Sequence, residues 1–232
     1  MTTSLLLAEL ELDIEWRSNE LIALFRDLTD DDNAKMRALR RATIPMLQSH
    51  AEGFVKFALQ SYLRHINSLN ISGATVRDIH LVWALHREFG NFISGSTDNG
   101  FKKLDIGALA STKSHYSRSS FINQLDKFQS SPINLDETRL DRLEQNLDQS
   151  YLSALLYQCG IDPVPHQSYS QKMNGMVQRR NSVAHGENEN ANISELKNWN
   201  NMVNILFREV RDSVFKAAIN REYLKLPQVS SI

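Results

Sequence analysis

The chain has 232 residues, with 26 Lys or Arg against 27 Asp or Glu and a formal net charge of −1. This balance argues against histone-like and ribosomal-type proteins, whose binding to nucleic acid depends on a large basic excess. It also argues against an acidic, disordered tail. The hydrophobic content of 41% is ordinary for a globular protein. A single cysteine, Cys159, rules out an internal disulfide framework and a zinc site built from cysteines.

No run of about 20 apolar residues is present, so we expect no membrane span. The first residues contain a short apolar run at 5–8, with no basic residue before it and with Glu9 and Glu11 directly after it. We therefore predict that the chain has no signal peptide and is cytoplasmic.

Glycine and proline are scarce, with nine and five residues, which favours helices over a many-stranded fold. Apolar residues at i, i+3 and i+4 steps predict a first helix over residues 4–28 and a long second helix that reaches residue 66. The aspartates at 30–32 separate the two and are expected to cap the second helix. Pro45 should kink this helix or mark a late start.

The middle of the chain is less regular, and residues 101–135 are left without an assignment. Its predicted elements are, in order, a loop at 68–75, a shorter helix within 76–94, a loop at 94–100, a helix over 136–147 and a helix over 149–159 that stops at Gly160.

Two prolines precede a helix predicted over residues 168–185, which Gly186 should end, and a strongly patterned last helix is predicted over 193–220. The chain shows no internal repeat. We therefore expect an all-α, antiparallel helical bundle with extra short helices, forming a single domain over residues 1–232.

Charge is unevenly distributed although the total is near zero. No Asp or Glu occurs from Pro163 to Gly186, and none from Ile106 to Leu125. Runs of this kind are commonly solvated faces. The first run differs because of the polar residues that it contains.

On an ideal helix, this first run presents two stripes. The polar stripe comprises Asn174, Gln178, Asn181 and His185, and the apolar stripe, the predicted core face, comprises Met173, Met176, Val177, Val183 and Ala184. Arg180 points into the middle of the apolar stripe. An arginine there needs a carboxylate, a phosphate or a subunit interface, because an unpaired buried charge is costly.

His185, Arg180 and Asn181 together suit the binding or cleavage of a phosphodiester. An imidazole transfers protons near neutral pH, a guanidinium stabilises charge on phosphorus, and an amide orients its neighbours. An arginine separated from a histidine by four to six residues occurs about 1.4 times by chance in a chain of this composition, but only His185 also has asparagine directly after the arginine. A histidine that caps the helix C-terminus beside a surface arginine remains the alternative.

The segment Arg180-Asn181-Ser182-Val183-Ala184-His185 resembles the R-N-x-x-x-H signature of HEPN domains (higher eukaryotes and prokaryotes nucleotide-binding). The stretch from Ser49 to Lys56 contains the sequence E-G-F-x-K and looks like one bacterial stand-alone branch of that superfamily. The resemblance covers most of the chain and is weakest over residues 95–148, a candidate insertion region.

The resemblance implies a helical bundle that dimerises so that two such motifs face each other. It also implies metal-independent cleavage of RNA, without a cofactor, in which the 2′-OH attacks the adjacent phosphorus and leaves a 2′,3′-cyclic phosphate. His185 would then transfer protons, with the partner subunit's His185 in the opposite role. Arg180 would stabilise the phosphorane, and Asn181 would orient the histidine or the phosphate.

Four further residues are expected to support this site. Arg179 fits the motif with one more spacer, so the choice between the two arginines stays open. Glu52 is expected to face a dimer interface or solvent. Lys172 and Gln178 are expected to contact RNA.

The expected partners are RNA, a second copy of the chain, and an antitoxin or other defence-system protein. The resemblance places the ribonuclease in a toxin–antitoxin, abortive-infection or restriction-linked system. One alternative is a non-catalytic module that binds RNA or a nucleotide and dimerises for another defence protein. A second alternative is an interaction scaffold.

Overall fold

The computed structural model describes residues 1–94, 101, 109–142, 146–162, 170–188 and 191–225. Within these ranges it contains eight α-helices, one 3₁₀-helix and, as the only β-structure, two isolated bridges. The predicted all-α class is confirmed. None of the described helices is long and apolar enough to cross a membrane.

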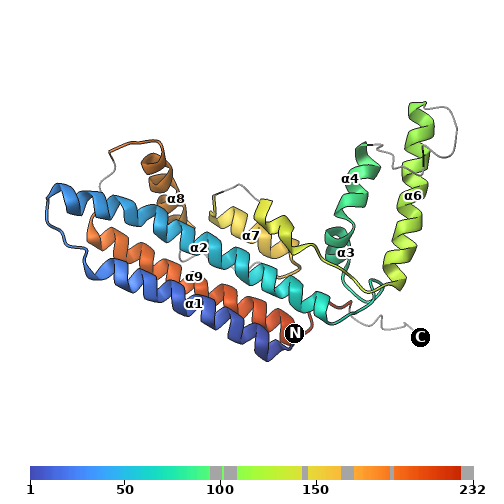
Figure 1. Cartoon of the computed structure of the whole chain (residues 1–232), viewed down its shortest axis with the longest axis horizontal. Helices are drawn as coiled ribbons and strands as arrows, with labels where there is room; N and C mark the ends of the chain where they lie inside the picture. The colour runs from blue at the N-terminus through green and yellow to red at the C-terminus, as the bar shows by residue number, and fades with distance from the viewer. Residues whose placement is uncertain (95–100, 102–108, 143–145, 163–169, 189–190, 226–232) are drawn as a thin grey trace.

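Three long helices form the body of the molecule and lie side by side (Figure 1): α1 (Thr3–Arg26), α2 (Ala34–Ser68) and α9 (Ile193–Ile219). α1 runs in the direction opposite to α2 and α9. Their apolar stripes meet in one core, where the rings of Phe54 and Phe207 pack edge to face at 4.9 Å. Burial of each such side chain contributes about 2 kcal/mol. The first and last predicted helices are confirmed.

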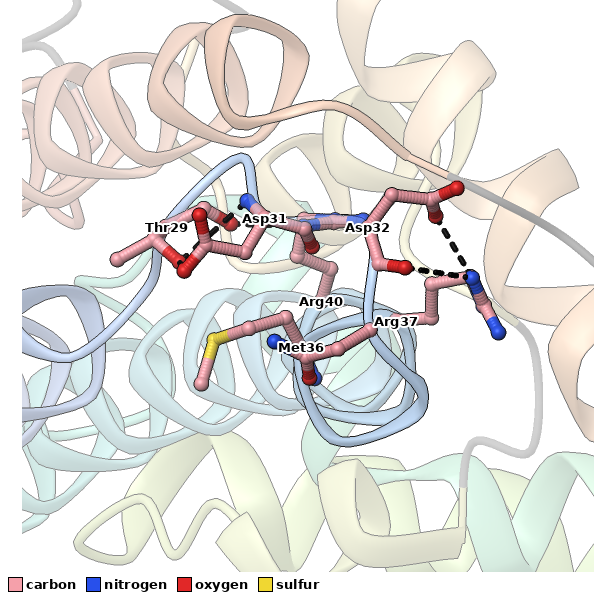
Figure 2. A network of polar contacts seen from close by, with 7 residues as sticks. Thr29, Asp31, Asp32, Met36, Arg37 and Arg40 are labelled. Carbon is pink, nitrogen blue, oxygen red and sulfur yellow. Dashed lines mark hydrogen bonds and ion pairs between the residues drawn. The ribbon is translucent and has the colours of Figure 1, made fainter.

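The connection between α1 and α2 corrects one prediction. The residue that caps α2 is Asn33 rather than an aspartate at 30–32, since Asn33 Oδ1 accepts a hydrogen bond from the backbone N–H of Met36 at 2.9 Å. Asp32 instead pairs with Arg37 at 2.7 Å (Figure 2). Asn33 takes the cap because it directly precedes the first helical residue.

The buried Arg40 holds this connection in place (Figure 2). Its Nη1 donates to the carbonyl oxygens of Thr29 at 2.7 Å and Asp31 at 3.1 Å. Asp30 Oδ1 accepts a hydrogen bond from the backbone N–H of Ile193 at 3.3 Å. The connection is therefore tied both to α2 and to the first residue of α9.

Pro45 lies inside α2, which begins well before it, so the predicted late start is wrong. A proline within a helix removes one backbone donor and costs about 3 kcal/mol. Its neighbours Ile44 and Leu47 are fully buried. Tertiary packing therefore holds the helix together through this position.

α3 (Asp78–Ala84), α4 (His86–Ser94) and α6 (Ala110–Ser130) form an arm that projects from the body (Figure 1). The shorter helix predicted within 76–94 is thus two helices, because the buried Leu85 interrupts the helical conformation.

The long helix α6 occupies most of the segment 101–135 that the sequence left without an assignment. Its Phe121 packs against Phe89 of α4 with the ring centroids 5.0 Å apart. The loop predicted at 94–100 falls, apart from Ser94, on residues outside the described ranges.

The segment after the arm is less helical than predicted. A 3₁₀-helix, η1 (Glu137–Arg142), lies where an α-helix was predicted over 136–147, and Leu147 is outside any helix. α7 (Gln149–Gln158) agrees with its prediction and ends before Gly160, which has a φ of +74°. A Cβ at Gly160 would lie 2.6 Å from the His80 ring, so this position requires glycine.

His80 lies completely buried beneath this turn, with Nε2 3.2 Å from the carbonyl oxygen of Cys159. Burial lowers the pKa of His80 to about 4, although the Cys159 carbonyl opposes the shift. Burial also lowers the pKa of His50 and of His65. The folded protein therefore favours neutral imidazoles at these positions.

We predict that the free energy of unfolding falls as the pH is lowered from 6.5 towards 4. In this window the unfolded chain binds a proton at His80 that the folded chain does not, and the loss from this residue amounts to about 3 kcal/mol. Urea titrations at both ends of the window measure it. The free energy of unfolding of His80→Gln should change less with pH than that of wild type. His115→Gln, which alters an exposed histidine, should show the same pH dependence as wild type. An unchanged dependence in His80→Gln would contradict the prediction.

Candidate functional site

α8 (Ser170–Ala184) carries the R-N-x-x-x-H motif at its C-terminal end. Met173 and Met176 are fully buried beneath it, as the apolar stripe predicts. The stripe is wrong at Ala184, which is exposed, and Arg180 is only half-buried. The helix separates from the core towards its end, so the motif residues remain open to a ligand.

Gly186 ends α8 in the predicted way, with a φ of +82°. Its N–H donates to the carbonyl oxygen of Val183 at 3.1 Å, and the N–H of Glu187 donates to that of Ser182 at 3.0 Å. This pair of hydrogen bonds is a Schellman motif, which only a left-handed residue such as glycine closes without strain. It leaves His185 as the exposed last residue of the helical turn.

The guanidinium of Arg180 is joined to the next residue of the motif. Its Nη1 donates to Asn181 Oδ1 at 3.2 Å. The backbone N–H of His185 donates to the carbonyl oxygen of Asn181 at 2.9 Å, so the histidine follows one helical turn further on. The three motif residues thus lie together at the end of α8.

A residue that the sequence did not single out completes this arrangement. Asn146, just before α7, donates from Nδ2 to Asn181 Oδ1 at 3.1 Å. The amide oxygen of Asn181 therefore receives two donors, one from Arg180 and one from Asn146. Its NH₂ group is left as the donor that faces away from them. No spacing rule points to Asn146, because it lies 35 positions before its partner.

The sequence led us to expect Glu52 at a dimer interface or in solvent. In the folded chain it lies against the segment that carries Asn146. Its Oε1 accepts hydrogen bonds from the backbone N–H of Leu147 at 3.0 Å and from Gln48 Nε2 at 3.0 Å. Gln48 Nε2 also donates to the Leu147 carbonyl oxygen at 3.2 Å. Two side chains of α2 thus hold both backbone groups of Leu147. The pKa of the nearby Tyr151 is raised, mainly by burial and to a lesser extent by the negative charge of Glu52.

Arg179 lies on a different face of α8 from Asn181. It pairs with Glu195 of α9 at 3.3 Å. With Lys172 and Gln178 it lines an open surface pocket of about 450 Å³ beside Trp199. The structure therefore places Arg180 beside Asn181, and gathers Arg179, Lys172 and Gln178 in a neighbouring pocket.

The site offers charge and proton transfer but no evident metal ligands. Among the described residues, no group of three or more His, Cys, Asp or Glu side chains could hold a metal ion. What it does present is an exposed imidazole, a guanidinium and an oriented amide, which are groups that bind and polarise a phosphate.

The family model described as MAE_28990-like HEPN matches residues 6–223. The chain belongs to this family of HEPN domains. No curated protein and no solved structure matches it. In this HEPN domain the matched region begins within α1 and extends beyond α9, so it includes the motif, the arm, and Gln48 and Glu52 of α2.

We predict that Glu52→Ala lowers the free energy of unfolding by about 2 kcal/mol, because the buried N–H of Leu147 loses a charged acceptor. Glu52→Gln should lose less, since an amide oxygen still accepts. Urea unfolding measures both. Glu15→Ala, at an exposed position of α1, is the control. If Glu52→Ala and Glu15→Ala lowered the free energy of unfolding equally, the hydrogen bond between Glu52 and Leu147 would not stabilise the fold.

Proposed function

We propose that this HEPN domain is a metal-independent endoribonuclease that acts in the cytoplasm. The observation that carries the proposal is the arrangement at the end of α8, where the amide of Asn181 is fixed by Arg180 and Asn146 one turn before the exposed His185. A proton-transfer group, a cation and an amide donor thus lie within about one and a half turns at the end of one helix.

In the proposed reaction, the RNA 2′-oxygen forms a bond to the adjacent phosphorus while the bond from phosphorus to the 5′-oxygen breaks. One imidazole takes the proton of the 2′-OH, and a second gives a proton to the leaving 5′-oxygen. The products carry a 2′,3′-cyclic phosphate and a 5′-hydroxyl. Arg180 stabilises the negative charge of the phosphorane, and the NH₂ group of Asn181 donates to a phosphate oxygen.

Two imidazoles are needed in opposite protonation states, whereas each chain has one motif histidine. We therefore infer a homodimer in which His185 and the partner subunit's His185 flank the phosphate. An antitoxin or defence-system protein that controls the cleavage is part of the proposal, as is a role in a toxin–antitoxin, abortive-infection or restriction-linked system.

We predict that the purified protein cleaves RNA in EDTA and that His185→Ala reduces the rate at least about 100-fold, since it removes the acid–base group. Cleavage and cyclic-phosphate ends are measured on a labelled RNA. His115→Ala, at an exposed histidine of α6, should cleave as wild type does. Full activity of His185→Ala would exclude the assigned mechanism. RNA binding without cyclic-phosphate ends would instead favour a non-catalytic binding module.

We predict that Asn146→Asp impairs cleavage more than Asn146→Ala. The carboxylate accepts rather than donates, so the amide of Asn181 would turn its NH₂ towards residue 146 and its oxygen towards the phosphate. Asn146→Ala removes one hydrogen bond and should cost about tenfold in rate. Single-turnover kinetics measure both variants. If Asn146 only filled space, the isosteric Asp would be the milder change, and that order would contradict the prediction.

A further inference from the structure

A second pocket opens on the other side of the motif from the pocket beside Arg179. It lies between the first turns of α2 and the end of α8 and encloses about 480 Å³. Arg37 and Arg41 line it from α2, and Val183 and Asn188 line it from either side of His185. Three alanines of α2 form the rest of its wall and leave room beside the two guanidinium groups.

Arg41, which lines the pocket, lies on the same face of α2 as the two side chains that hold Leu147. Gln48 follows Arg41 by seven residues, about two helical turns, and Glu52 follows by eleven, about three. These three side chains therefore share a face. Arg41 lines the pocket next to Val183, and Gln48 and Glu52 hold the segment that carries Asn146. An RNA strand bound at His185 would lie next to this pocket, because Val183 and Asn188 line it on either side of that histidine.

Charge in the pocket is positive and incompletely neutralised. Arg37 pairs with the exposed Asp32 at 2.7 Å (Figure 2). Arg41 is half-buried and makes no hydrogen bond or ion pair with any residue that the structure describes. Among the residues that the structure describes, no carboxylate lines the pocket. A half-buried guanidinium without a protein partner is stabilised by an anion, and its planar donors match the oxygens of a phosphate.

We propose that this pocket binds a phosphodiester of the RNA strand next to the one that is cleaved, with Arg41 as the main contact and Arg37 as a second one. The proposal rests on the proposed function for the identity of the ligand. It assigns α2 a role in holding the strand, separate from the groups on α8 that perform the chemistry.

The test is fluorescence anisotropy with a labelled single-stranded RNA roughly twelve nucleotides long. The full chain is used with His185→Ala, so that binding is measured without cleavage. Adding Arg41→Ala should weaken binding about tenfold. It should also reduce the slope of log affinity against log salt by about 1, because one phosphate contact is lost. Lys216→Ala, an exposed cation in the last turn of α9, should change neither.

A second variant is expected to strengthen RNA binding, a result that loss of folding could not produce. Asp32→Asn releases Arg37 and should strengthen RNA binding about threefold. Asp212→Asn is its matched control. Asp212 also pairs with an arginine, Arg211, at 2.8 Å, but it lies near the C-terminal end of α9 and does not line the pocket. Equal strengthening by both variants would mean general electrostatics and would overturn the proposal.

Two failures are distinguishable. If wild type cleaves RNA through His185 but Arg41→Ala binds as tightly as the parent, the proposed function stands and the pocket does not bind the strand. If wild type binds RNA without cleaving it, and Arg41→Ala and Asp32→Asn shift the affinity as stated, the pocket binds the strand and the nuclease proposal fails.

Discussion

Burial of α2 along most of its length is the constraint on which the other contacts depend. One side of the helix packs against α1 and α9, with Phe54 against Phe207, and another side holds Leu147 through Gln48 and Glu52. A shift of the helix by one residue would rotate every side chain by about 100°. The same position of α2 therefore determines the core contacts and the contacts to Leu147. Through Asn146, next to Leu147, it also determines where the amide of Asn181 is held.

The E-G-F-x-K segment shows how closely these roles are combined. Glu52 holds the segment of Asn146, and Phe54 enters the core. Between them, Gly53 makes room for Arg17, because a Cβ would lie 2.7 Å from Arg17 Nη1. Arg17 is buried and pairs with Asp13 at 2.6 Å, and loss of one partner of such a pair is costly. Three successive residues thus meet three different neighbours.

A net charge near zero is compatible with an RNA site because the charges are arranged locally. Arg179 and Arg37 are paired with Glu195 and Asp32. Arg180 and Arg41 form no ion pair with a carboxylate among the described residues. Arg180 belongs to the motif, and Arg41 lines the pocket next to the end of α8. In the proposed complex, the unpaired guanidinium groups near the end of α8 would therefore bind only a few phosphates at once.

The sequence by itself determined the three long helices of the body, the ends of α7 and α8 near Gly160 and Gly186, and the R-N-x-x-x-H motif. Apolar periodicity and the left-handed conformation of glycine are local properties that a short window contains. Some predictions from local pattern were wrong. α2 begins before Pro45 rather than after it, and Ala184 is exposed rather than buried. Only the tertiary structure decided that Asn146 contacts Asn181 and that Glu52 holds the segment of Asn146. These contacts join residues 35 and 95 positions apart, and helical spacing carries no information about such pairs.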